Sequence, residues 1–189
     1  ENGNLKFNGS DALQLAPTND LFYITLGDSS IVKSSEMTMS GAKIEQLKGC
    51  EKAIKKAEQY DGYKLTAEFK YNNLTIDWSA VLRDNSHYLR TEMKISAKED
   101  TEMINIVPME YTLTDNADAV IVNGEVRGAP LTSSKIFAGI ETPLGINSVD
   151  GNTIKGLWSR ATTLKAGDTW SIGAVVGLVA EDQLRRSFL

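Results

Sequence analysis

Polar and apolar residues alternate one by one through the middle of the chain. Between residues 63 and 71, apolar side chains at every second position are separated by lysine, threonine and glutamate. This period of two is typical of a strand with one face on a core and the other in water. The alternation recurs over 74–82, 89–97 and 107–113, with polar breaks between the segments. We therefore expect the segments 63–71, 74–82 and 89–97 to form a meander of three antiparallel strands that share one core, and 107–113 to add a further strand.

Shorter apolar runs follow the meander. The run 119–122 ends at Asn123-Gly124, a pair typical of tight turns. The runs 157–164 and 170–178 are separated by the turn-like sequence Lys-Ala-Gly-Asp at 165–168. Many strands with turn signals between them predict an all-β fold, a large antiparallel β-sandwich.

Two stretches depart from the strand pattern. Residues 50–60 are rich in lysine, glutamate and alanine and precede Gly62, which predicts one short surface helix. At the end of the chain, Leu184 and Phe188 lie four apart, on one face of a helical turn that needs something to pack against. We expect residues 1–180 to form the sandwich domain and 181–189 to begin a linker or helix that leads to another domain.

Composition and charge exclude several classes of protein. The chain has 189 residues, of which 41% are hydrophobic and 24% charged, values close to those of ordinary folded domains. Its net charge is -5 and its basic residues are scattered, so we expect no nucleic acid partner. The longest apolar stretch, 174–180, is too short to cross a bilayer, so we expect no membrane partner either.

Cysteine and histidine each occur once, which limits the chemistry open to the chain. Cys50 alone forms no intrachain disulfide, and with His87 it is too little for a zinc site of the Cys/His type. His87 stands in the polar run DNSHY, and no GxSxG nucleophile motif or glycine-rich phosphate loop is present. We expect no cofactor and no metal ion.

Carboxylates and exposed aromatic rings are the remaining candidates for a site. A glycosidase needs two carboxylates on either side of a sugar, and sequence spacing cannot test their separation. Glu141 stands out because it lies in the mostly apolar run KIFAGIETPLGI, where a partner such as Arg127 or Arg160 is expected. The commoner explanation for such a residue is a structural ion pair or a turn. Trp158, at a strand start, offers a flat apolar platform for a sugar ring.

Three segments together resemble a known family. They are LTIDWSAVLRDNSHYLR at 74–90, GEVRGAPLTSSKIFAGIETPLG at 124–145 and LKAGDTWSIGAVVGLVAEDQLRRSFL at 164–189. They resemble the amino-terminal β domain of secreted bacterial glycoside hydrolases related to the α-galactosidases of clan D. The resemblance implies a galactose mutarotase-like supersandwich, followed after RRSFL by a (β/α)8 barrel that holds the catalytic carboxylates. It also implies a secreted, periplasmic or cell-surface location.

The same resemblance indicates polar positions for a site. Arg83, Asp84, Asn85, Arg127 and Glu141 match polar positions of the family's motifs, where they bind sugar or brace the fold. The family pattern has glycine in place of Asn85, and asparagine suits a left-handed turn. It has a polar asparagine or serine in place of His87, so the match assigns no role to this histidine. With the two aromatic residues added, the candidate carbohydrate-binding residues are Arg83, Asp84, Asn85, Tyr88, Arg127, Glu141 and Trp158.

Three functions are open at this point. The first is a non-catalytic amino-terminal domain of a glycoside hydrolase that supports its own carboxy-terminal catalytic barrel and contacts carbohydrate. The second is an independent carbohydrate-binding module for an oligosaccharide or polysaccharide. The third is an aldose epimerase-like enzyme, whose chemistry needs a general acid and base, and a single histidine in a polar turn argues against it.

Overall fold

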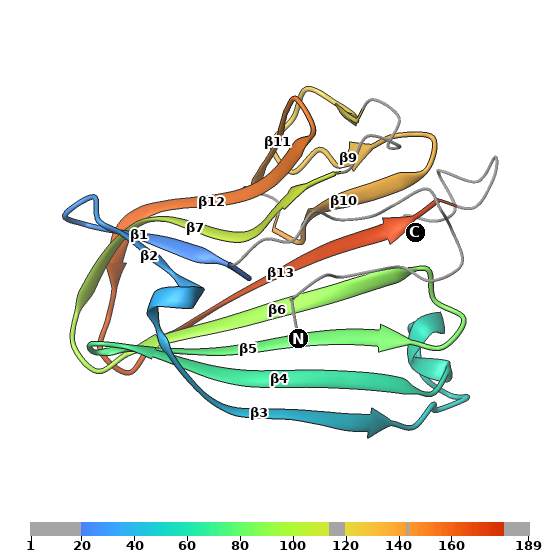
Figure 1. Ribbon diagram of the computed structural model, residues 1–189, viewed down its shortest axis with the longest axis horizontal. Helices are drawn as coiled ribbons and strands as arrows, with labels where there is room; N and C mark the ends of the chain where they lie inside the picture. The colour runs from blue at the N-terminus through green and yellow to red at the C-terminus, as the bar shows by residue number, and fades with distance from the viewer. Residues whose placement is uncertain (1–19, 114–119, 143, 180–189) are drawn as a thin grey trace.

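Two antiparallel sheets make up the part of the chain that the computed structural model describes, residues 20–113, 120–142 and 144–179 (Figure 1). The predicted all-β sandwich is confirmed. Residues 181–189, expected to begin a linker or helix, lie outside the described residues, so that expectation stays a prediction.

The larger sheet has eight strands. In spatial order they are β3 (Thr38–Leu47), β4 (Gly62–Tyr71), β5 (Leu74–Arg83), β6 (Tyr88–Ala97), β13 (Thr169–Leu178), β10 (Ile136–Ile140), β9 (Leu131–Thr132) and β8 (Ile121–Val122). β4, β5 and β6 follow one another as hairpins, which confirms the predicted meander, and β3, which was not predicted, adds a strand at its edge. β13 then returns from the end of the described chain to pair with β6.

The smaller sheet has five strands and covers one face of the larger one. Its spatial order is β11 (Ile146–Asp150), β12 (Thr153–Leu164), β7 (Thr101–Thr112), β1 (Tyr23–Leu26) and β2 (Ile31–Lys33). β7 follows β6 along the chain but belongs to this second sheet, so the meander ends at β6 and the chain crosses to the other side of the core. The two predicted strands at 157–164 and 170–178 are β12 and β13 and lie in different sheets.

The helix predicted over residues 50–60 is present only as the four-residue 3-10 helix η2 (Lys56–Gln59). No side-chain hydrogen bond caps its start at Lys55. The side chain of Ile54 is fully exposed, so the segment has no apolar face on the core to support a longer helix. A second short 3-10 helix, η1 (Ser34–Glu36), follows β2.

The core lies between the two sheets and is built from the alternating apolar positions. Ile76 of β5, Met93 and Ile95 of β6 and Ile106 of β7 are all completely buried. Ahead of β1, Phe22 packs edge-to-face on Phe69 of β4, with ring centroids 5.1 Å apart. The core face of the larger sheet is therefore sealed where the smaller sheet lies over it.

Candidate functional site

An open pocket lies on the outer face of the larger sheet, at β6, β13 and β10, and we call it the Tyr88 pocket. Its volume is about 510 Å³. Tyr88 and Arg90 of β6, Phe137 of β10, Arg127 and Glu141 line it. It thus brings together three of the residues predicted from the sequence, Tyr88, Arg127 and Glu141.

Two glycines of β13 make room for this pocket. A Cβ atom at Gly177 would lie 2.5 Å from the ring of Phe137 and 2.7 Å from Cβ of Tyr88. At Gly173, a Cβ atom would collide with the carboxylate of Glu141. The missing side chains let two rings and one carboxylate lie close to the sheet. The centroids of the Tyr88 and Phe137 rings are 6.4 Å apart, and Tyr88 is partly exposed whereas Phe137 is buried.

Arg90 and Glu141 form a two-point ion pair in the pocket. The Nε of Arg90 donates to both carboxylate oxygens of Glu141, at 2.9 and 2.8 Å, and its Nη2 lies 2.7 Å from Oε2. These bonds to Glu141 raise the pKa of the Arg90 guanidinium above its ordinary value. Both side chains are about a third exposed, so the pair fixes geometry more than it adds stability. The partner of Glu141 is therefore Arg90, and the expected partners Arg127 and Arg160 were wrong.

A buried asparagine holds the loops at the rim of the pocket. The Oδ1 of Asn147 accepts from the backbone of Ile140 at 3.1 Å, and its Nδ2 donates to the backbone of Ala129 at 3.0 Å. Gly128 donates its backbone N–H to Gly145. These bonds fix the loop that carries Arg127 to the end of β10.

Arg83, Asp84 and Asn85 lie outside the residues described as lining this pocket. Arg83 donates to the backbone oxygen of Tyr60 at 2.9 Å, and the N–H of Asp84 donates to that of Asp61. Asn85 has a φ of 57°, the left-handed conformation expected for it. Arg83 ends β5, Asp84 and Asn85 lie in the turn that follows, and the bonds of Arg83 and Asp84 brace the segment around η2. A role for them in sugar binding stays a prediction.

Trp158 is half-buried and covered by a neighbour. The guanidinium of Arg160 lies 4.6 Å from its ring centroid and 4.4 Å from that of Trp170. The two indole rings meet edge to face, with centroids 6.1 Å apart. The ring of Trp158, expected to offer a flat platform, is therefore covered by an arginine of the same strand. Sugar binding by Trp158 stays a prediction.

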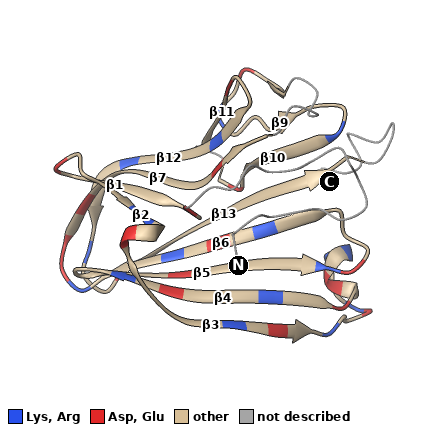
Figure 2. Cartoon of the chain, in the orientation of Figure 1, with Lys and Arg blue, Asp and Glu red and all other residues tan. Residues whose placement is uncertain are grey.

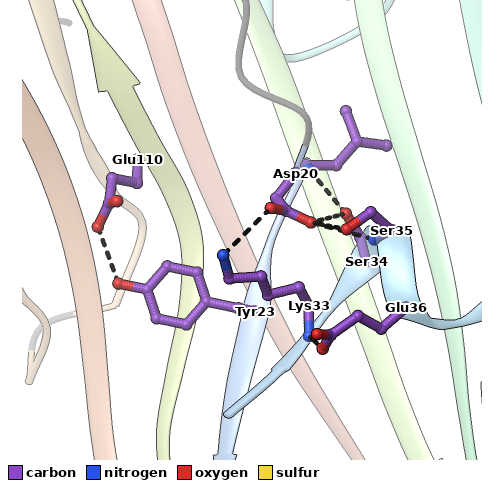
Figure 3. Close-up of polar contacts among 8 residues, drawn as sticks. Asp20, Tyr23, Lys33, Ser34, Ser35, Glu36 and Glu110 are labelled. Carbon is purple, nitrogen blue, oxygen red and sulfur yellow. Dashed lines mark hydrogen bonds and ion pairs between the residues drawn. The ribbon is translucent and has the colours of Figure 1, made fainter.

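A second polar cluster lies on the smaller sheet (Figure 3). Tyr23 donates its hydroxyl to Glu110 at 2.8 Å, and Lys155 lies 3.3 Å from the same carboxylate. Burial is the main cause that raises the pKa of Tyr23. Nearby, Asp20 accepts from the backbone N–H and the hydroxyl of Ser35. The contacts of Glu110 tie β1 to β7 and β12, and those of Asp20 hold the chain before β1 to η1. The role of this cluster is therefore structural.

The described residues show neither a metal-binding group nor a membrane span. In residues 20–113, 120–142 and 144–179, no three His, Cys, Asp or Glu side chains gather to hold an ion. The same ranges contain no helix long and apolar enough to span a bilayer. Figure 2 shows Lys and Arg interspersed with Asp and Glu along β3 to β6, so this surface has no single sign of charge.

Several residues of the pocket were not predicted from the sequence. Arg90 was taken only as an alternating strand position, Phe137 only as part of an apolar run, and Lys55 only as part of a surface helix. The available signal was the pair Gly173 and Gly177 within the predicted strand 170–178, because glycine in a strand interior often marks a close approach.

Comparisons with known proteins give a likeness of fold and no family. No family model matches the chain, and no curated protein matches it either. Similar solved structures include a protein named as a kojibiose phosphorylase from the human microbiome, at 12% identity and a TM-score of 0.48, covering 97% of this chain. The GH36 α-galactosidase AgaB from Geobacillus stearothermophilus has 9% identity, a TM-score of 0.46 and 89% coverage.

A third solved structure is the heparan sulfate lyase HepC from Pedobacter heparinus, with 14% identity, a TM-score of 0.42 and 95% coverage of this chain. The chain spans only 27%, 32% and 30% of the three proteins. At these scores, the likenesses assign neither an activity nor a ligand.

Proposed function

We propose that this chain is a non-catalytic, galactose mutarotase-like β-sandwich domain of a carbohydrate-active enzyme, and that it contacts carbohydrate at the Tyr88 pocket. The observation that carries the proposal is the accessible ring of Tyr88 beside Arg127 and the Arg90–Glu141 pair in one open pocket. Sugar sites combine an aromatic platform with a few oriented polar groups. The family resemblance of the sequence supports the same conclusion.

The bonds that Glu141 already makes to Arg90 support a non-catalytic role for the pocket. Glycoside hydrolysis needs two carboxylates that flank the sugar. Among the described lining residues of the Tyr88 pocket, Glu141 is the sole carboxylate, and Arg90 engages both of its oxygens. An epimerase-like mechanism would need a histidine beside it, and His87 is not among the described lining residues.

The catalytic chemistry on this proposal belongs to a (β/α)8 barrel on the same polypeptide. Active sites of such barrels lie at the carboxyl ends of their strands, where a neighbouring domain can lend a loop. The whole protein would act as a secreted, periplasmic or cell-surface enzyme on an oligosaccharide or polysaccharide. The support for both statements is the resemblance of the segments at 124–145 and 164–189.

Calorimetric titration with a panel of neutral and charged oligosaccharides tests the proposal. We expect Tyr88→Ala to weaken binding about tenfold, because one stacked ring contributes on the order of 1.4 kcal/mol. Tyr63→Ala is the matched control, because Tyr63 is an exposed tyrosine on the opposite face of the same sheet. It should leave the affinity unchanged.

Two outcomes would overturn the proposal. If the chain binds no glycan in the panel, it does not contact carbohydrate. If it accelerates mutarotation or glycoside hydrolysis, and Glu141→Gln abolishes that rate, the chain is an enzyme. Equal binding by the chain alone and by the chain joined to its barrel would favour the independent binding module.

A further inference from the structure

The polar groups of the Tyr88 pocket divide into those already bonded and those open to a ligand. Both oxygens of Glu141 accept from Arg90, and both amide atoms of Asn147 bond to backbone. The negative charge of Glu141 is therefore already balanced by Arg90, although its oxygens and the lining hydroxyl groups can still accept hydrogen bonds. The charged groups that the described lining residues still offer to a ligand are donors.

Two cations are among those donors. Within the described part of the chain, Arg127 makes no hydrogen bond or ion pair, and its side chain is exposed at the pocket. The Nζ of Lys55 is 3.8 Å from Glu58, with both side chains largely exposed, so this contact is weak. Arg90 is the third lining cation and is neutralised by Glu141.

The charge of the pocket is opposite to that of the chain. The described lining residues include three cations, Lys55, Arg90 and Arg127, against the single carboxylate of Glu141. The chain as a whole has a net charge of -5. A concave site with a local excess of positive charge concentrates anions, and guanidinium groups match carboxylate and sulfate geometry.

We propose that the ligand of the Tyr88 pocket is an anionic sugar, one that carries a carboxylate or a sulfate. This rests on the proposed function, since it names the class of carbohydrate at that site. The sugar ring lies on Tyr88, and its anionic group accepts from Arg127, with Lys55 beside it. The Arg90–Glu141 pair forms the wall that orients the ring.

Titration of the chain with three oligosaccharides of one length tests this. The probes are a galacturonate oligomer, a sulfated galactose oligomer and the neutral galactose oligomer. We expect at least one charged probe to bind at least tenfold more tightly than the neutral one, with an affinity that falls as salt rises. The two charged probes distinguish a carboxylate from a sulfate as the preferred group.

Variants of Arg127 complete the test. Arg127→Gln should weaken the charged probe about tenfold and leave the neutral probe unchanged, and Arg127→Lys should restore part of the loss. The control is Lys33→Gln, an exposed cation on the smaller sheet.

Three other outcomes of these titrations would contradict the proposal. A neutral probe that binds as tightly as the charged ones overturns the anionic ligand and leaves carbohydrate binding intact. Charged probes that bind equally to the wild type and to Arg127→Gln overturn this assignment of the site. The absence of binding by all three overturns the anionic ligand, and the wider oligosaccharide panel then decides whether the chain contacts carbohydrate.

Discussion

The two ends of the hairpin β4–β5 differ sharply although their sequences follow one pattern. At the end near the turn, Phe69 and Ile76 are 3% and 0% exposed. At the open end, Tyr63 and Leu82 are 53% and 44% exposed. All four side chains point to the same face, because Phe69 pairs with Ile76 and Tyr63 pairs with Leu82.

The difference comes from what lies over each end. Phe22, just before β1, packs on Phe69 and seals the turn end, whereas Leu65 and Ile44 at the open end remain 38% and 71% exposed. In Figure 1, η2 stands beside this open end, on the far side of the picture from β1 and β2. Alternation of polar and apolar residues therefore sets the face of a strand but not its burial.

The largest expected effect is at the sealed end. Ile76→Ala should lower the free energy of unfolding by about 3 kcal/mol, because a completely buried side chain leaves a cavity when it is shortened. Chemical denaturation measures it, and Ile76→Val, which removes one methyl group, should cost about 1 kcal/mol. A loss below about 1 kcal/mol for the alanine variant would contradict a sealed core.

Most of the strand pattern could be predicted from the sequence because it is local. The period of two and the turn residues identified β4, β5, β6, β7, β12 and β13. Asn72, in the polar break between β4 and β5, has a φ of 51°, a left-handed conformation that asparagine tolerates. The assignment of strands to sheets could not be predicted. The pairing of β13 with β6 joins residues about eighty apart, and no local signal encodes it.

The site was harder to predict than the fold for the same reason. Glu141 was singled out correctly as a carboxylate in need of a partner, but that partner lies on β6, fifty-one residues earlier. Trp158 was a candidate platform for a sugar ring, and the structure shows that the guanidinium of Arg160 lies over it. Residue type predicts the need for a contact, whereas the tertiary fold selects the contact.

A pH-dependent effect of intermediate size tests how well the far end of β7, away from the β4–β5 turn, is shielded from water. Tyr111, on β7 of the covering sheet, packs against the core, and burial raises its pKa from 10.0 to about 12. The folded state therefore holds this proton more tightly than the unfolded chain, so stability falls as pH rises from about 10 to about 12. The loss should reach about 2 kcal/mol and be smaller in Tyr111→Phe.

Urea denaturation of both proteins at pH 8 and at several values up to pH 12 measures this difference. At pH 8 tyrosine is protonated in both states, so that value gives the effect of the lost hydroxyl alone. Parallel curves for the wild type and Tyr111→Phe would show that water reaches the ring, and that the cover over this part of the core is incomplete.

The smallest effect is expected at the open end, and it sharpens the comparison most. Leu82→Ala lies in the same strand and on the same face as Ile76→Ala, but its side chain is already 44% exposed and leaves no closed cavity. We expect a loss of about 0.5 kcal/mol or less in the same denaturation experiment. A loss close to that of Ile76→Ala would mean that this end is buried in solution. If that loss grew with protein concentration, a second copy of the chain would be the cover, and if it did not, the cover would belong to the same chain.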